Sequence, residues 1–477
     1  MLASTIFPKY TKKGMHMHFP NRIYGLEFEH GVQECDSSGS FHEEGAANDN
    51  FILHPLEDSV FNTTRMRRWH SNGSCSYIDT GGHPEHATAE CLSIRDAVLY
   101  AKAGDAIMNK IFGRMLPSGN TMHLFKNNLA LNEFLVHSMS YGCHENYHTS
   151  VQKLPVMRLI PLLITRQIID GAGWFSKDNY ILSQRALVMV RDISSNTLSE
   201  RGIINDKDGS DTGPTPRHHI ICGDSNILEF AMYLKLGTVA LTLALIESDK
   251  VPQVPCLTPV MTMQLIAQST DPFLPCIGVA ATGQKSAYDV QVMYLEVAQR
   301  ELESGSFDSE ETEAELKHVA LCWEQTLNAI YNRDISWMLG RLDHVTKKFL
   351  ADREVARSKL TDPMEIFLMK KDIDLLYHDI TPGSLPYRMN DAWPERRILT
   401  DAQIDRAVTE PPKNTRAYMR SRFIRRVIEQ NNSAQNILNW EKCGFSGNDG
   451  ESFYLPDPFQ TESPEFEQFL ALPPASL

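Results

Sequence analysis

Acidic side chains gather in two short stretches that have the alternating pattern of β-strands. In the first stretch, Glu27 and Glu29 stand two residues apart, so their side chains share one face of the strand. The opposite face is apolar: Tyr24, Leu26 and Phe28. Two carboxylates on one face repel each other unless a cation lies between them, and hard oxygen ligands suit Mg²⁺, which usually also binds substrate phosphates. This stretch indicates a metal site, with a solvated polar face as the alternative for the two residues alone.

The second stretch, residues 71–91, adds a carboxylate beside a glycine pair. Tyr77 and Asp79 face the same way, and Gly81 and Gly82 end the strand and allow a ligand or a neighbouring backbone to come close. Alone, this stretch could equally be a polar hairpin on the surface. If the two strands pair, five polar side chains crowd a single site: Glu27, Glu29, Tyr77, Asp79 and Glu85.

The elements that must position these residues follow from hydrophobic periodicity. An amphipathic helix is predicted over residues 93–115, with Ser93 as its N-cap, and a second helix over residues 154–170. Further strands are predicted over residues 123–128, 140–150 and 203–224, the last interrupted by a loop at 206–216. From residue 227 to about 378 the chain has mostly helical patterns: 228–248, 284–304, 310–332, 335–359 and 363–377.

A dozen short motifs, in order from about residue 22 to about residue 459, resemble those of one enzyme family. They are YGLEFEHGV, YIDTGGHPEHATAEC, LFKNN, YGCHENY, TRQIIDGAG, LSQRA, RGIIN, RHHIICGDSN, LKLGT, DLLYHDI, EPPKNTRA and DPF. Each motif is weak alone, but their shared order resembles the family of Pup ligases and Pup deamidases/depupylases, relatives of glutamine synthetase and the carboxylate-amine ligases.

The resemblance implies an α+β fold in which a glutamine synthetase-like concave antiparallel β-sheet, packed with helices, holds ATP and Mg²⁺. We expect an N-terminal extension over residues 1–20, a large catalytic domain over 21–396 and a small C-terminal domain over 397–477. The boundary follows a segment rich in proline and glycine at residues 381–397. Thr400, followed by Gln403, then provides the start signal of a helix.

The resemblance also assigns roles to individual residues. The metal ligands that it implies are Glu27, Tyr77 and Glu85, to which position in the motifs adds Glu29, His144 and His219. Asp79 is the implied catalytic carboxylate. The implied nucleotide contacts are Thr88, Arg217 and Trp440. Because ATP is strongly negative, metal ions and an arginine fork must offset its charge before a carboxylate can approach. A structural histidine is the alternative for His144.

A basic segment stands out in residues 415–430. Arg416 and Arg420 are spaced to share one helix face, and so are Arg422 and Arg426. In a chain with a net charge of −14, these residues predict a local positive face. The face is either simply solvated or it binds the acidic, disordered modifier Pup, which folds on binding.

Two positions depart from the family pattern. Cys75 stands where an arginine is usual, two positions before the motif's tyrosine, and His86 stands where a tyrosine is usual. A cysteine cannot replace a guanidinium fork on a phosphate. Either Arg65, Arg67 or Arg68 supplies the missing group, or nucleotide binding is altered.

The implied activity is that of an ATP-dependent ligase. It would phosphorylate the C-terminal glutamate of a Pup-like modifier and join it to a lysine of a target protein, with Asp79 accepting the proton of the lysine ammonium. Three features favour the ligase: the short spacing between the two acidic strands, the cysteine at Cys143, and the sequence of residues 88–91. The alternatives are the deamidase/depupylase of the same fold and a degenerate, non-catalytic modifier-binding protein, the latter motivated by Cys75.

Composition sets the remaining bounds. The negative net charge does not suit a nucleic-acid-binding protein, and nine cysteines without a CxxC pair fit a reducing compartment. The longest apolar run, residues 227–246, contains Glu229 and Lys235, which predicts a buried helix and not a membrane span. The first 20 residues lack the apolar core of a signal peptide. We therefore expect a cytoplasmic protein without nucleic-acid or membrane partners.

Overall fold

A mostly antiparallel sheet forms the centre of the molecule. The computed structural model describes residues 17–35, 41–42, 56–62, 66–113, 120–131, 137–150, 155–206, 216–277, 283–430, 436–445 and 452–472. Within these residues, nine strands pair in the order β15 (Arg191–Ile193), β16 (Gly202–Asn205), β17 (Arg217–Ile220), β12 (Cys143–His148), β2 (Tyr24–Glu29), β8 (Pro84–Ala87), β7 (Cys75–Ile78), β6 (Arg67–His70) and β5 (Ser59–Asn62). Every pair is antiparallel except β15 with β16, which is parallel.

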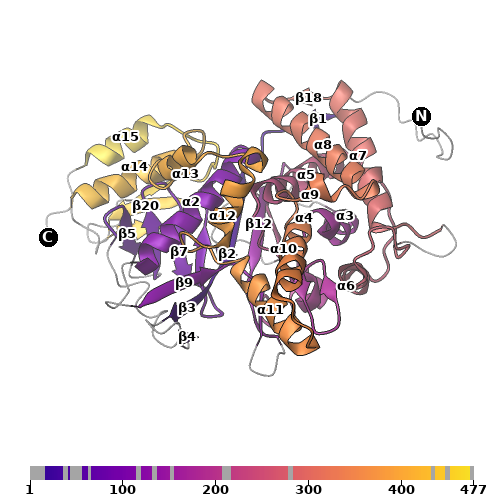
Figure 1. Ribbon diagram of the computed structural model, residues 1–477. Coiled ribbons are helices and arrows are strands. Elements are labelled where there is room, and N and C mark those ends of the chain that lie inside the picture. The colour runs from indigo at the N-terminus through magenta and orange to yellow at the C-terminus, as the bar shows by residue number, and fades with distance from the viewer. Residues whose placement is uncertain are drawn as a thin grey trace.

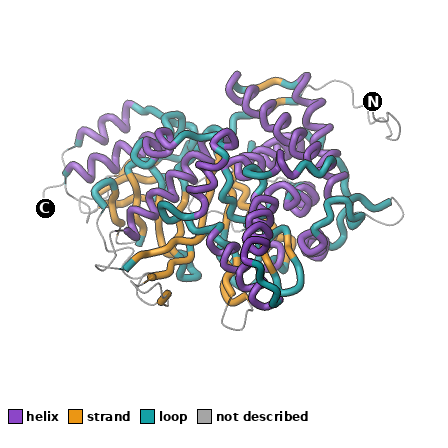
Figure 2. Tube along the Cα trace, viewed as in Figure 1, coloured by secondary structure: helices purple, strands orange, loops and turns teal. Residues whose placement is uncertain are grey.

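Smaller strand pairings surround this sheet. They involve β1 (His18–Phe19), β3 (Gly31–Cys35), β4 (Phe41–His42), β9 (Thr121–Phe125), β10 (Leu129–Leu131), β11 (His137–Ser140), β13 (Trp174–Phe175), β14 (Tyr180–Ile181), β18 (Ser306–Phe307), β19 (Asn436–Leu438), β20 (Lys442–Phe445) and β21 (Ser452–Tyr454). In Figure 2 the strands gather on one side of the molecule and most helices on the other. The expected α+β fold with an antiparallel sheet packed by helices is confirmed.

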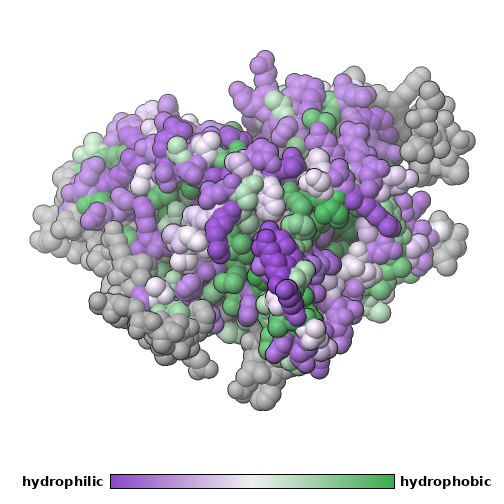
Figure 3. Space-filling model, viewed as in Figure 1, coloured by the Kyte–Doolittle hydropathy of each residue, from purple (hydrophilic) through white to green (hydrophobic). Residues whose placement is uncertain are grey.

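Helices pack on the sheet and extend away from it (Figure 1). They are α2 (Ile94–Gly113), α3 (Ile160–Thr165), α4 (Gln167–Asp170), α5 (Glu229–Glu247), α6 (Pro259–Ser269), α7 (Ala287–Ser304), α8 (Glu310–Tyr331), α9 (Ile335–Met338), α10 (Asp343–Ser358), α11 (Pro363–Leu376), α12 (Leu385–Ala392), α13 (Asp401–Ala407), α14 (Arg416–Glu429) and α15 (Pro464–Ala471). Helix α2 packs on β2 and β8. Hydrophilic side chains predominate over the outer faces of α7 and α8 in Figure 3.

Two predicted helices are broken in the structure. The helix expected over residues 335–359 divides into α9 and α10, because Gly340 between them adopts a φ of +72°, which a helix cannot contain. The helix expected over residues 154–170 is also divided, into a 3₁₀ turn at Val156–Arg158 followed by α3 and α4. The N-cap prediction is confirmed, since Ser93 Oγ accepts the backbone N–H of Asp96 at 3.0 Å.

Helix α5 is apolar all round and lies inside the protein. It is long and apolar enough to cross a membrane by length and composition, but its apolar window is wholly buried by the rest of the structure. This is the environment of a core helix, and it confirms the buried helix predicted over residues 227–246. Cytoplasmic localisation stays a prediction.

The chain's last elements add a second core at one end of the sheet. Side chains of the C-terminal elements, among them Met419 and Phe423, pack against Val60, Trp69 and Cys75 of strands β5 to β7. Figure 1 shows α14 and α15 beside this edge of the sheet. The division of the chain at residue 396 stays a prediction.

Candidate active site

The register of the sheet brings the two acidic stretches onto one face. Glu29 of β2 lies opposite Glu85 of β8, Glu85 lies opposite Tyr77 of β7, and Tyr77 lies opposite Arg67 of β6. Directly opposed residues of antiparallel strands share a face, so these four side chains form one cross-strand row. Glu27 is on the same face of β2 as Glu29 because strand side chains alternate. The strand of Glu27 and Glu29 does not pair directly with the strand of Tyr77, because β8 lies between β2 and β7, but the sheet still brings the two acidic stretches onto one face.

Glu27 is the centre of a first cluster that β12 and β17 complete. Its Oε2 lies 3.2 Å from His144 Nδ1 and 3.8 Å from His219 Nε2. Its Oε1 accepts a hydrogen bond from Asn146 Nδ2 at 3.0 Å and lies 3.9 Å from Arg217 Nη1. One ligand atom from each of Glu27, His144 and His219 lies within 4.8 Å of the others, so the three could hold one cation.

A second cluster consists of Glu29, Asp79 and His83, whose ligand atoms also lie within 4.8 Å of one another. His83 Nδ1 is 2.9 Å from Glu29 Oε2 and 4.0 Å from Asp79 Oδ1. Asp79 follows β7, and its Oδ1 accepts the backbone N–H of His83 at 2.6 Å across the turn between β7 and β8. His83 is the residue that the sequence reasoning left out of the site, although its place directly after the glycine pair was a signal.

Gly142 has no side chain to fill the space between the two clusters. A Cβ at this position would lie 2.5 Å from Glu29 Oε1 and 2.6 Å from His144 Nε2, closer than real Cβ contacts. The backbone oxygen of Gly142 accepts the N–H of Glu29 at 3.1 Å, which aligns β12 with β2. The absence of a side chain here lets the Glu29 carboxylate and the His144 imidazole approach each other.

The acidic groups of this face influence one another's protonation. Burial and the negative charges of Glu27, Glu29 and Asp79 raise the pKa of Glu85 well above its usual range. Burial also raises the pKa of Glu27, but a hydrogen bond from His144 and the charges of His219, His144 and Arg217 lower it more, so the net direction is downward. Without a cation the site therefore favours a proton on one carboxylate, which is the behaviour of an oxygen-rich metal site.

Asp79, which follows β7, is a second acidic residue of this site whose pKa is raised. Burial and the charge of Glu29 raise the pKa of Asp79 above its usual range, although hydrogen bonds from the backbone of His83 and Gly81 oppose the shift. A carboxylate with a raised pKa is a stronger base than an ordinary one. The geometry of the face therefore combines cation ligands with a candidate general base.

A pocket opens at the other end of β2. Its cavity volume is about 100 Å³, and the three predicted nucleotide contacts, Thr88, Arg217 and Trp440, all line it. Thr88 Oγ1 accepts the backbone N–H of Leu26 at 3.0 Å, so this side chain also fixes β2. Glu27 lines the pocket as well, which joins it to the first cluster.

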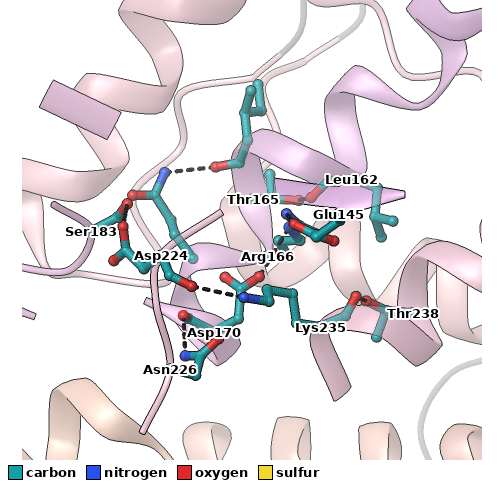
Figure 4. Close-up of polar contacts among 12 residues, drawn as sticks. Glu145, Leu162, Thr165, Arg166, Asp170, Ser183, Asp224, Asn226, Lys235 and Thr238 are labelled. Atoms are coloured by element: carbon teal, nitrogen blue, oxygen red, sulfur yellow. Dashed lines mark hydrogen bonds and ion pairs between the residues drawn. The ribbon is translucent and has the colours of Figure 1, made fainter. Parts of the chain in front are cut away.

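A buried ionic network holds β12 from behind the sheet (Figure 4). Arg166 donates from Nη1 to Glu145 Oε2 at 2.9 Å and lies 2.9 Å, through Nε, from Asp170 Oδ2. Lys235 donates to the backbone oxygen of Asp224 at 2.7 Å. Because Glu145 follows His144 directly and points to the opposite face, its bond with Arg166 fixes the strand that carries the histidine.

Helix α14 does not present the single basic face that its arginine spacing predicts. Arg416 and Arg420 are 4% and 0% exposed, and both bind Glu90. Arg416 Nε lies 2.9 Å from Glu90 Oε1, and this arginine lines the pocket described above. The prediction of an exposed positive face is wrong for these two residues, because their charges offset a buried carboxylate.

The other two arginines of that set are bound to α15. Arg422 donates from Nη2 to Glu467 Oε2 at 2.7 Å. Arg426 donates to backbone carbonyl oxygens of Phe469 and Leu470. Both are partly accessible, and a modifier contact through Arg422 and Arg426 stays a prediction.

The two departures from the family pattern lie in different places. Cys75 is fully buried in the second core, and burial raises the pKa of its thiol to about 12. His86 faces away from the site, where its Nδ1 lies 2.9 Å from Ser76 Oγ and its ring fills the space above Gly104 of α2. His86 therefore does not alter the polar face.

The structure distinguishes between the arginines that could replace the one missing at Cys75. Arg67 lies on the site face, with its Cζ 5.2 Å from the centre of the Tyr77 ring. Arg68 points to the other face, where it donates to Ser59 Oγ at 3.0 Å. Arg65 lies outside the described residues.

Known proteins are similar to this chain over most of its length. A family model described as Pup-ligase protein matches residues 22–443. The Pup--protein ligase of Acidimicrobium ferrooxidans is 33% identical, over 94% of this chain and 98% of its own length. The Pup--protein ligase of Corynebacterium aurimucosum is 32% identical, over 95% of this chain and 96% of its own length.

Two solved structures are similar to this chain over most of both lengths. The complex between the prokaryotic ubiquitin-like protein Pup and its ligase PafA matches with 28% identity and a TM-score of 0.80, covering 94% of this chain and 92% of that one. The Pup ligase PafA in complex with ADP matches with 29% identity and a TM-score of 0.72, covering 88% and 90%. Because the family model and the relatives both extend over nearly the whole sequence, the chain belongs to the Pup-ligase protein family.

Proposed function

We propose that this protein is an ATP-dependent ligase that joins the C-terminal glutamate of a Pup-like modifier to a lysine of a target protein. The observation that carries the proposal is the sequence of features along one sheet face: a pocket lined by Thr88, Arg217 and Trp440, then the Glu27 cluster, then the Asp79 cluster. Phosphoryl transfer followed by attack of an amine needs these three parts in this order. The relatives named as Pup ligases, one of them solved with ADP, support the same reaction.

The donor set of the face fits Mg²⁺. Carboxylate oxygens dominate it, and the raised pKa of Glu85 marks negative charge that a divalent cation would offset. We propose Glu27, Tyr77 and Glu85 as the principal ligands, and Glu29, His144 and His219 as further ones. When bound, Mg²⁺ would neutralise charge on the transferring phosphoryl group.

The chain's own residues would then perform two tasks. Arg217, held by a 2.7 Å hydrogen bond to Asn146 Oδ1 at the pocket wall, would offset phosphate charge while the modifier's γ-carboxylate takes the γ-phosphate of ATP and ADP leaves. Asp79 would accept a proton from the target lysine ammonium, because only the neutral amine is a nucleophile. Attack of that amine on the glutamyl phosphate forms the isopeptide bond and releases phosphate.

Turnover by the purified protein tests this proposal. The protein would be mixed with Mg²⁺, ATP, a Pup-like modifier that ends in glutamate and a lysine-bearing target, and ADP and conjugate would be measured by chromatography and mass spectrometry. We expect one ADP for each conjugate formed. Release of modifier from a preformed conjugate without conjugation activity would indicate the deamidase/depupylase instead, and no turnover in either direction would indicate a non-catalytic protein.

Replacing Glu27 by glutamine is expected to weaken binding of Mg²⁺-ATP by about 10- to 100-fold, since a charged ligand and its hydrogen-bonding partners are lost together. Isothermal titration with ATP at two Mg²⁺ concentrations measures this, and excess Mg²⁺ should restore part of the affinity. Glu200→Gln, an exposed change in an ion pair with Arg191, is the matched control. Unchanged affinity in Glu27→Gln would remove this residue from the metal site.

Replacing Arg67 by alanine is expected to raise the KM for ATP by about 10-fold, because a guanidinium that faces the site contributes a charge-assisted contact to phosphate. Arg68→Ala removes the neighbouring guanidinium on the opposite face of β6 and is the control. Steady-state kinetics at saturating modifier gives the KM for ATP of each variant, which should rise in Arg67→Ala and not in Arg68→Ala. An equal KM for ATP in wild type and Arg67→Ala would show that Arg67 does not replace the arginine missing at Cys75.

A further inference from the structure

Strand β2 ends at Glu29, on the side of the sheet face that lies away from the proposed nucleotide pocket. The pocket lies at Gly25 of β2, and Glu29 lies four residues further along the strand, a rise of roughly 13 Å. A substrate that reacts with ATP in this pocket would therefore extend toward the Glu29 end. Two arginines, Arg185 and Arg201, interact electrostatically with Glu29.

Arg185 is a buried cation without an acidic partner in an ion pair among the described residues. It is 2% exposed, and its guanidinium donates only to uncharged oxygens: Ser140 Oγ at 2.8 Å, Tyr141 O at 3.2 Å and Ile221 O at 2.9 Å. These bonds fix the turn before β12 and leave the positive charge uncompensated by a contacting carboxylate. A charge buried in this way creates a strong local field toward nearby anions.

Arg201 supplies a second cation whose side chain makes no ion pair or hydrogen bond within the described part of the chain. It precedes β16, and strand alternation puts it on the same face as Asn205, which lies opposite His219 of the first cluster. Its guanidinium is half-buried and interacts electrostatically with Glu29 and with Arg185. The backbone around it is fixed, since its carbonyl oxygen accepts the N–H of Val190 at 2.9 Å.

We propose that Arg201, with the charge of Arg185 behind it, binds the free α-carboxylate of the modifier's C-terminal glutamate. This inference rests on the proposed function and adds which part of the substrate is recognised. Fixing the α-carboxylate at this end leaves the γ-carboxylate pointing along the face toward the metal ligands and the nucleotide. The pair of arginines thus selects a terminal glutamate, which has two carboxylates, over a glutamate inside a chain, which has one.

The test compares two synthetic peptides that carry the modifier's last residues. One ends in glutamate with a free α-carboxylate, and the other ends in glutamate α-carboxamide, which keeps the γ-carboxylate. For the wild-type protein we expect kcat/KM to be about 10- to 100-fold higher for the free acid, the worth of one or two charge-assisted hydrogen bonds. In Arg201→Met that preference should fall to near 1, while the KM for ATP stays at the wild-type value.

Arg201→Lys keeps the charge without the planar fork and should retain part of the preference. Arg191→Met is the matched control, because Arg191 is exposed on the neighbouring strand and pairs with Glu200 at 2.9 Å. Equal use of both peptides by the wild type, or a full preference kept in Arg201→Met, would overturn the assignment. If the wild type conjugates neither peptide, the proposed function fails, and fluorescence anisotropy of the labelled peptides decides the inference: tighter binding of the free acid, lost in Arg201→Met, supports it, and equal binding overturns it.

Discussion

Replacing Asp79 by asparagine is expected to lower the rate of conjugation by at least ~10²-fold, the lower end of what a general base contributes. Asparagine keeps the shape of the side chain and its acceptor for the backbone N–H of His83, so the turn between β7 and β8 should survive. The amide cannot accept the lysine proton. The measurement is single-turnover conjugation by purified protein, together with ATP affinity, which should change little because Asp79 does not line the nucleotide pocket.

The pH dependence of the same variant adds a second readout. In the wild type, burial and Glu29 raise the pKa of Asp79, so activity should fall on the acidic side at a higher pH than for an ordinary carboxylate. The residual activity of Asp79→Asn should not show this fall at acidic pH. Near-normal conjugation by a variant that binds ATP normally would show that another group accepts the proton.

The second large effect concerns stability. Replacing Arg420 by methionine should lower the free energy of unfolding by about 3–5 kcal/mol, because the change leaves the Glu90 carboxylate, only 11% exposed, without one of its two guanidinium partners. Arg420 is fully buried, and it also donates to the backbone oxygens of Gly73 and Trp440, at 3.0 Å and 2.8 Å. Urea unfolding followed by tryptophan fluorescence measures the loss, since Trp440 lies under the Arg420 guanidinium.

Two comparisons make this result specific. Arg425→Met, on the exposed side of the same helix, should change stability by less than ~0.5 kcal/mol. The double variant of Arg420→Met with Glu90→Gln should lose less than the sum of the single changes, because no unpaired charge remains. Strict additivity of the two single variants would mean that the two side chains do not stabilise each other.

The contact of Glu90 with its two arginines also predicts how the stability of the fold depends on pH. Burial raises the pKa of Glu90, but Arg420 and Arg416 lower it more, from an ordinary 4.5 to about 2. A carboxyl group with a lowered folded-state pKa contributes stability that is present above its unfolded pKa. This contribution should be complete above about pH 4.5 and should disappear as the pH falls through about 2.

The strand faces of the site could be predicted from the sequence because alternation is a local property. Glu27 and Glu29 on one face, and Tyr77 with Asp79 on another strand, follow from a period of two residues. Which strand lies beside β2 does not follow from periodicity. His144 and His219 reach Glu27 only through the pairing of β12 with β2 and with β17, contacts between residues far apart in sequence. The resemblance to a family supplied these two residues, and the residue patterns alone did not.

The arginines of α14 show what local spacing could not predict. Their spacing correctly predicted a helix, and the structure places it at Arg416–Glu429. Helical spacing cannot show which face another element covers, and here β5, β6 and α15 pack against the helix. Glu90, the carboxylate that binds two of these arginines, lies more than 300 residues away in sequence. A long-range partner of this kind leaves no signal in the local pattern of the helix.

The C-terminal elements form one wall of the proposed nucleotide pocket, through Arg416, Trp440 and Pro458. The same elements share a core with the edge of the sheet. Opening of this segment would therefore dismantle the pocket, so a nucleotide that occupies the pocket binds the closed form and not the open one. By mass action, bound nucleotide stabilises the closed form, so the C-terminal segment opens less often as the nucleotide concentration rises. Local opening of the segment and release of the nucleotide are therefore thermodynamically linked.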